Sequence, residues 1–158
     1  MAEKKKKVKQ IEIINRKAAH GYFFRDTYEA GIVLRGTEIK SIRAGSVNLN
    51  DSFCYFSKGE LLVRNMYIKE YDFGNQFNHE ARRARKLLLK KTELRKLEKK
   101  VKEKGFTIIP YRLFMTERGF AKLEVMLAEG KKSFNKRDSI KQKDLKRDAA
   151  RQMKNYRL

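Results

Sequence analysis

The sequence TIIPYRLFMTERGFAKLEVMLA, residues 107–128, predicts two long antiparallel strands joined by a short turn. Two apolar runs, 107–116 and 120–128, flank the polar segment Glu117-Arg118-Gly119. Gly119 stands where a hairpin turn needs a residue that tolerates a positive φ. The stretch therefore indicates that the chain is built on antiparallel β-structure.

Two further segments extend this β-structure along the chain. Residues 52–57 and 60–68 flank Lys58-Gly59 and predict a second hairpin. Residues 86–90 are expected to form a strand in which alternate side chains face the core and the others face outward.

The run over residues 28–42 changes its phase part of the way along. Ile32 and Leu34 fall on even positions, whereas Ile39 falls on an odd one. Because one extra residue reverses the face to which each side chain points, Gly36 predicts a bulge in one long, bent strand. A tight hairpin at Gly36 and the residue before it is the alternative.

Two helices are predicted. Asn15 is a candidate N-cap for a short helix over residues 17–20, and Thr92 for a longer one over residues 93–104. Gly105 fits the C′ position of the longer helix. That helix has a narrow apolar stripe at i, i+3 and i+7, formed by Leu94, Leu97 and Val101.

Together these elements predict a mainly β fold, a small antiparallel β-barrel of the oligonucleotide-binding type with two or three flanking helices. Residues 8–130 hold nearly all the large apolar side chains and are expected to form this single domain. Residues 1–7 form a basic leader, and residues 131–158 form a basic tail.

The tail has too few apolar residues to offset the entropy of ordering it. Its composition nevertheless favours a helix with one weak apolar face. We expect a tail that is disordered alone and becomes helical against RNA; a permanently disordered, solvating tail is the alternative. The weak face consists of Leu145, Ala149, Met153 and Tyr156.

The net charge indicates a polyanionic partner. The chain has 40 Lys and Arg against 19 Asp and Glu, a formal charge of +21 that attracts nucleic acid. No apolar run approaches the roughly 18 residues needed to cross a bilayer, so no membrane partner is expected. The single cysteine, Cys54, fits a reducing cytoplasm and is expected to be buried and inert.

No recognised catalytic pattern is present in the sequence. The two histidines, His20 and His79, lie far apart, and there is no C-x-x-C, no G-x-x-x-x-G-K-[ST] and no nucleophile elbow. We therefore expect neither an enzyme nor a cofactor or metal.

Two basic clusters are candidates for contacting RNA phosphates. The first surrounds Leu87-Leu88-Leu89, and a solubilising rim along an edge strand is its alternative. The second lies at the junction of core and tail. The first cluster comprises Arg82, Arg83, Arg85, Lys86, Lys90 and Lys91, and the second comprises Lys131, Lys132, Lys136 and Arg137.

Selectivity for RNA requires groups other than phosphate binders. His20, beside Arg16 and Lys17, is the best candidate for stacking on a base, with a capping or hydrogen-bonded surface role as the equal alternative. Glu29 is able to accept from a base amino group or a 2′-hydroxyl. The residues alone favour an ion pair between Glu29 and a lysine.

The stretch NRKAAHGYF, residues 15–23, resembles the opening N-[RK]-[RK]-A-x-H-x-Y-F of the bacterial tmRNA-binding proteins (small protein B, the SsrA-binding family). EAGIVLRGTEIKSIRAG, residues 29–45, is similar to that family's E-A-G-[IL]-x-L-x-G-x-E-[IV]-K-S-[LI]-R-A-G. RKLLL at 85–89 and GKK at 130–132 continue the resemblance, which covers essentially the whole chain in order.

The resemblance implies a protein that binds the tRNA-like domain of tmRNA and enters stalled ribosomes in trans-translation. Its tail would fold in the empty mRNA channel of the small subunit, against rRNA near the decoding centre. The protein would act as a cytoplasmic monomer without cofactors. A ribosomal or assembly protein that binds rRNA is the rival hypothesis. An RNA-modifying or nuclease enzyme is the least favoured one.

Matched position by position, the family pattern implies RNA contacts from Asn15, His20, Glu29, Leu88 and Lys122, and it would settle Glu29 as an RNA contact. The family motif K-K-x-x-D-K-R has Asn135 in place of its Asp, which removes a charge but keeps an acceptor oxygen. Gln152 stands where related chains often have an apolar residue before Met-Lys. The complete expected RNA-binding set is Asn15, Arg16, Lys17, His20, Glu29, Arg43, Arg83, Arg85, Lys86, Leu88 and Lys122, and the expected tail set is Lys131, Lys132, Asn135, Lys136, Arg137, Met153 and Lys154.

Overall fold

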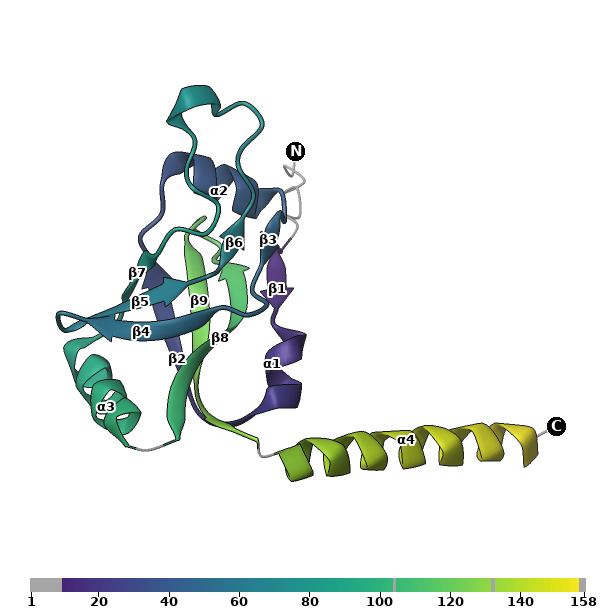
Figure 1. Ribbon diagram of the computed structural model, residues 1–158. Helices are drawn as coiled ribbons and strands as arrows, with labels where there is room; N and C mark the ends of the chain where they lie inside the picture. The colour runs from purple at the N-terminus through teal and green to yellow at the C-terminus, as the bar shows by residue number, and fades with distance from the viewer. Residues whose placement is uncertain (1–9, 104, 132, 157–158) are drawn as a thin grey trace, which may run out of the picture.

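The computed structural model describes residues 10–103, 105–131 and 133–156, and it shows a curled antiparallel sheet with helices around it (Figure 1). The elements, in chain order, are β1 (Glu12–Ile14), α1 (Arg16–Gly21), β2 (Tyr22–Ile32), α2 (Gly36–Arg43), β3 (Val47–Asn48), β4 (Phe53–Ser57), β5 (Glu60–Arg64), β6 (Tyr67–Ile68), the 3-10 turn η1 (Asn75–Phe77), β7 (Arg85–Leu88), α3 (Lys91–Lys102), β8 (Phe106–Met115), β9 (Ala121–Gly130) and α4 (Ser133–Tyr156).

The main sheet closes nearly into a ring. Its strand order is β1-β8-β4-β5-β7-β2-β9, and β8 and β9 also pair with each other. The seam between β4 and β8 is narrow, with the single residue pair Cys54–Ile108. A mainly antiparallel, barrel-like sheet is therefore confirmed, with β3 and β6 as a separate two-stranded ribbon.

Both predicted hairpins are present. β8 and β9 pair from Phe106–Glu129 to Met115–Ala121, and Gly119 in the turn has a φ of 87°. β4 and β5 pair throughout, and Gly59 between them has a φ of 77°. Both glycines occupy the left-handed region, where a side chain would strain the turn.

The prediction of one long strand over residues 28–42 is wrong, and so is the alternative hairpin at Gly36. β2 ends at Ile32, and α2 begins at Gly36. The signal for a helix start was present, because Glu38 is the third residue of α2 and its side chain accepts from the Arg35 backbone N–H at 3.3 Å. The change of phase came from helical periodicity and not from a bulge.

The two predicted helices form, with one correction. Asn15 caps α1, because its side-chain oxygen accepts from the Ala18 N–H at 3.2 Å. α3 begins one residue before Thr92, and its cap is Lys90, whose backbone N–H donates to Glu93 at 3.2 Å. The apolar stripe packs on the core as expected, with Leu97 fully buried and Leu94 and Val101 partly buried.

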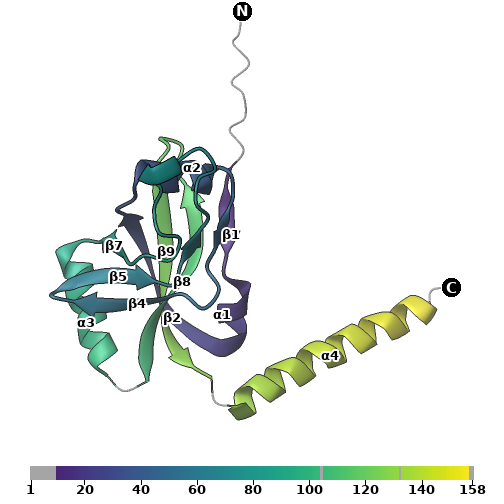
Figure 2. The same cartoon turned by 45° about the horizontal axis from the view of Figure 1, so that its top comes forward.

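The core fills the inside of the ring. Leu61, Leu87, Leu113 and Leu123, from four different ring strands, are fully buried or nearly so. α2 and α3 lie at opposite ends of the ring (Figure 2) and add Ile42 and Leu97 to the same core. Cys54 is buried as predicted, and burial raises the pKa of its thiol far above the ordinary value.

The tail differs from the expectation of disorder in the absence of RNA. Residues 133–156 form one continuous helix that extends away from the ring (Figures 1 and 2). The segment contains no Gly or Pro, and eight of its residues are Lys or Arg, which have good helix propensity without packing. The helix favoured by the composition is therefore present without RNA. Leu145 and Met153 of its weak apolar face are exposed, at 68% and 72%. None of the described helices is long and apolar enough to cross a membrane.

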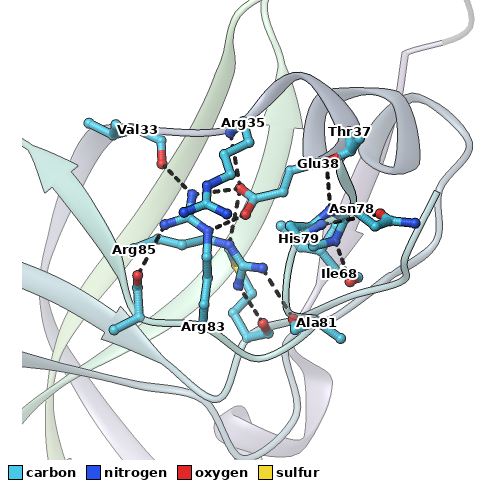
Figure 3. A network of polar contacts seen from close by, with 12 residues as sticks. Val33, Arg35, Thr37, Glu38, Ile68, Asn78, His79, Ala81, Arg83 and Arg85 are labelled. Carbon is cyan, nitrogen blue, oxygen red and sulfur yellow. Dashed lines mark hydrogen bonds and ion pairs between the residues drawn. The ribbon is translucent and has the colours of Figure 1, made fainter. Parts of the chain in front are cut away.

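A buried carboxylate joins α2 to β7. Glu38 is fully buried and accepts from Arg83 through both of its oxygens (Figure 3). Arg85, also fully buried, places its Nε 3.3 Å from Glu38 and donates to the carbonyls of Met66 at 2.7 Å and Ala81 at 3.1 Å. The expectation that Arg85 binds RNA is therefore wrong, because its guanidinium is enclosed.

The charges around Glu38 hold it in its ionised form. Burial by itself would raise the pKa of Glu38, but the hydrogen bond from Arg83 and the charges of Arg85 and Arg83 outweigh burial and lower the pKa below the ordinary value. Removing this carboxylate would leave Arg85 buried without a counter-charge. Such a loss typically costs about 3–5 kcal/mol.

Glu38→Gln should therefore lower the free energy of unfolding by roughly 3–5 kcal/mol at neutral pH. The pKa of Glu38 is lower in the folded state than in the unfolded state. Its stabilising effect is therefore fully present at pH values above the unfolded-state pKa of about 4.3, and it is lost as the pH falls through the folded-state pKa. Urea unfolding between pH 7 and pH 3 measures both effects, and the acid-dependent loss of stability should be smaller in the variant.

The matched control is Glu60→Gln, which breaks an exposed pair with Lys86 at 2.8 Å. Exposed pairs contribute about 0–1 kcal/mol, so this variant should unfold close to the wild type. Equal stability of the two variants would contradict the role given to Glu38.

Candidate nucleic-acid interface

A shallow depression lies on the outer face of the ring, where β2, β7 and β9 meet. Its lining includes Glu29 and Gly31 from β2, Leu88 from β7, and Lys122 from β9. Gly31 pairs with Leu88 in the sheet, and a Cβ on Gly31 would lie 3.4 Å from the Cβ of Leu88. The ring thus brings together Glu29, Leu88 and Lys122, three sequence-predicted residues from distant parts of the chain.

The charged groups of the depression pair with each other. Lys122 Nζ lies 2.7 Å from Glu29 Oε1, and both side chains are about half exposed. Exposed ion pairs contribute about 0–1 kcal/mol, so a ligand with its own charges separates this pair at small cost. The ion pair predicted for Glu29 is present, and beside it Leu88 exposes 53% of its surface.

A second group of predicted residues lies around α1. Arg16, Lys17 and His20 are all exposed on this helix, and Lys17 pairs with Asp51 at 2.9 Å. Lys131, just after β9, places its Nζ 5.0 Å from the centre of the Phe23 ring and donates to the Ala19 carbonyl at 3.3 Å. Lysine and aromatic groups at this end of β2 form a surface suited to phosphate and to a stacked base.

The two groups lie toward opposite ends of one strand. Phe23 and Glu29 are six residues apart on β2, a distance of about 20 Å at the usual rise of a strand. An RNA helix is wide enough to meet both groups.

Asn15 belongs to the scaffold and not to the exposed surface. It is 98% buried, and its side-chain amide donates to the carbonyls of Leu49 and Pro110, both at 3.1 Å, in addition to capping α1. These bonds join α1 to β8 and to the segment before β4. The pattern match at Asn15 is therefore explained by folding, and its side chain has no free group facing outward.

The other expected RNA-binding residues of the body lie outside both groups, and some of them pair with a carboxylate. Arg83 is largely enclosed against Glu38, whereas Lys86 is exposed and pairs with Glu60. Arg43 is exposed at the end of α2, the helix that covers one end of the ring. Sequence reasoning missed Glu93, which lines the depression; its position three residues after the α3 cap was the available signal.

The expected tail residues lie only in part among those that can be described. Arg137, Met153 and Lys154 are exposed on α4. Lys132 and the side chains of Asn135 and Lys136 lie outside the described part of the chain. Across residues 10–103, 105–131 and 133–156, no group of three or more metal-ligating side chains occurs.

The fold and these surfaces define a class, a small basic β-ring protein that presents its binding groups on an open surface. The family model described as SmpB protein matches residues 12–155, and the chain belongs to this family. The SsrA-binding protein of Bacteroides thetaiotaomicron is 58% identical over 144 residues, covering 91% of this chain and 96% of that protein. The SsrA-binding protein of Moorella thermoacetica is 45% identical over 148 residues, covering 92% and 96%.

A solved structure agrees with the family assignment. A chain from the structure "tmRNA-SmpB: a journey to the center of the bacterial ribosome" is 50% identical, with a TM-score of 0.67, and the match covers 78% of this chain and 86% of that chain. The family predicted from the sequence is confirmed, and with it the expectation of a binding protein and not an enzyme.

Asn15→Ala should lower stability while leaving no contact surface altered. The substitution removes the α1 cap and leaves two buried backbone carbonyls without a hydrogen-bond donor. It should lower the free energy of unfolding by about 1–3 kcal/mol. Thermal unfolding measures the effect. Asn50→Ala, at an exposed position next to Leu49, is the control and should change stability by less than about 0.5 kcal/mol. An Asn15→Ala protein as stable as the wild type would show that the buried amide is not structural.

Proposed function

We propose that this chain binds the tRNA-like domain of tmRNA and delivers it to stalled ribosomes for trans-translation. Membership of the SmpB family supports the proposal, as do the names of its relatives as SsrA-binding proteins. The observation that supports it most directly is the meeting of Glu29, Leu88 and Lys122 in one depression on a chain of charge +21. The protein acts as a cytoplasmic monomer and needs no cofactor.

The depression supplies selectivity through groups that recognise more than charge. When RNA approaches, Lys122 exchanges Glu29 for a phosphate, and Glu29 accepts from a base amino group or a 2′-hydroxyl. Leu88 offers an apolar surface to the sugar or to an unstacked base. Phosphate contacts from Lys90, which lines the depression, and from Lys86, two residues before Leu88 on β7, add affinity that depends on salt.

The α1 group holds a second part of the same RNA. Arg16 and Lys17 bind phosphates, and His20 stacks on or donates to a base. Phe23 is 41% exposed beneath Lys131, so the aromatic face and the cation are available together. Two separated contacts on β2 select for the shape of a folded RNA over a short single strand.

The tail acts on the ribosome and not on the RNA held by the body. Its many cations and unpacked helix suit the mRNA channel, whose walls are RNA. Lys132, Lys136 and Arg137 contact rRNA near the decoding centre, and Met153 and Lys154 lie farther along the channel. Lys131, at the junction of body and tail, stays with the RNA held by the body. Asn135, in place of the family Asp, keeps a hydrogen-bonding role there without an ion pair.

Leu88→Asp tests the depression, because it places a carboxylate where phosphates would pass. The side chain is half exposed, so folding should be retained. RNA recovered from cells with the wild-type protein should contain tmRNA. The amount of tmRNA recovered with the variant should be lower by roughly tenfold or more. Phe120→Asp, an equivalent change at an exposed side chain that does not line the depression, is the control and should retain tmRNA.

Recovery of rRNA without tmRNA by the wild type would contradict the proposed partner and favour an rRNA-binding protein. Equal tmRNA recovery by wild type and Leu88→Asp would contradict the proposed surface but leave the partner standing.

Deletion of residues 133–158 should separate RNA binding from ribosome rescue. The shortened chain keeps Lys131 against Phe23, so its affinity for the isolated tRNA-like RNA should stay within about threefold of the full chain. Tagging of proteins stalled on ribosomes in a purified translation system should be abolished. Parallel loss of RNA binding and tagging would contradict the division of labour between body and tail.

A further inference from the structure

The loop between β6 and β7 exposes two phenylalanines. Among the large apolar side chains of the described residues, Phe73 and Phe77 are the most exposed, at 80% and 79%. Both belong to the segment KEYDFGNQFNHE, residues 69–80, here called the aromatic loop. Single exposed apolar residues are ordinary, but two large ones on one short loop mark an interaction site.

The aromatic loop has a defined conformation, held by one asparagine. The Asn78 side chain accepts from the Tyr71 N–H at 3.0 Å and donates to the Tyr71 carbonyl at 2.7 Å. The N–H of Gly74 also donates to that carbonyl, at 2.9 Å. A Cβ on Gly74 would lie 2.8 Å from the Asn78 side chain and would displace it from these hydrogen bonds.

The base of the loop is fixed to the body through His79, which is 99% buried (Figure 3). His79 Nε2 lies 2.9 Å from the Ile68 carbonyl and must donate to it, so Nδ1 is free to accept from the Thr37 hydroxyl, also at 2.9 Å. Tyr71 packs edge-to-face on Phe73 with ring centres 5.6 Å apart. These hydrogen bonds define the backbone of the loop, and the contact with Tyr71 orients Phe73.

The charge of the aromatic loop is opposite to that of the chain. Residues 69–80 hold one lysine, Lys69, against three carboxylates, Glu70, Asp72 and Glu80, a net charge of −2 in a chain of +21. Lys69 pairs with Asp72 at 3.6 Å, and Lys40 from α2 lies over the Tyr71 ring at 5.0 Å. Carboxylates beside exposed rings repel RNA phosphates, whereas they complement lysine and arginine on a protein.

We propose that the aromatic loop is a protein-docking element that inserts Phe73 and Phe77 into an apolar pocket bordered by Lys and Arg on a partner protein. The surface is separate from the depression and from α1, so the body is able to hold RNA and a protein at the same time. The inference does not depend on which RNA the body binds.

The test places a photoreactive phenylalanine analogue, p-benzoylphenylalanine, at position 73 of the full-length protein in cells, with position 120 as the matched control. Phe120 is also exposed, at 66%, but lies in the β8–β9 turn. Irradiation should yield a protein adduct from position 73 and not from position 120. Peptide mapping should place the attachment in a segment bordered by Lys or Arg.

Charge reversal distinguishes docking from chance proximity. Glu70→Lys combined with Asp72→Lys should reduce the adduct from position 73 by roughly tenfold, because like charges then face each other. Phe77→Ser should reduce it similarly. Its melting temperature and its affinity for the tRNA-like RNA should stay those of the wild type, because Phe77 lies outside the core and its replacement changes no charge.

Three results would overturn the proposal. Position 73 could form adducts with RNA alone, it could form no more adduct than position 120, or it could form a protein adduct whose yield is unchanged by the charge reversal. Affinity for the tRNA-like RNA, measured on the same proteins, reports on the proposed function separately.

Discussion

The pairing of one buried carboxylate with two arginines is the interaction on which this structure depends. Glu38 counters the charge of Arg85, which lies inside the body and donates to the Met66 and Ala81 carbonyls. Arg85 begins β7, a four-residue strand that joins β5 to β2 in the ring. Because side chains alternate along a strand, enclosing Arg85 and Leu87 turns Lys86 and Leu88 outward. The internal ion pair thereby sets what the outer surface presents.

Closure of the ring explains why residues distant in sequence act together. Glu29 and Lys122 are neighbours because β2 and β9 pair from Tyr22–Gly130 to Gly31–Lys122. The same pairing places Lys131 beside the end of α1. The body thus supports the two groups that we propose to contact RNA, whereas α4 extends from it as a cationic helix on which Leu145 and Met153 are exposed. Among the described cations, only Arg85 is buried, and Glu38 counters its charge.

The sequence was sufficient for both hairpins, the Asn15 cap and the α3 stripe, since each depends on local periodicity and turn chemistry. It was insufficient for α2, where Glu38 followed Arg35 at capping-box spacing but the alternation of apolar residues suggested a strand. It also assigned Arg85 to the surface, because six positive charges in a run give no sign that one has a buried partner 47 positions earlier. Of the site, sequence resemblance located Glu29, Leu88 and Lys122, yet only the paired strands show that they meet.

Amide hydrogen exchange of the full chain, with and without the tRNA-like domain of tmRNA, tests most directly the claim that a preformed outer surface binds RNA. The account predicts slower exchange on RNA binding over residues 16–23, 29–31 and 86–90, with the aromatic loop and the buried strand segment 123–127 unchanged. Protection confined to other parts of the body while RNA is bound would contradict it.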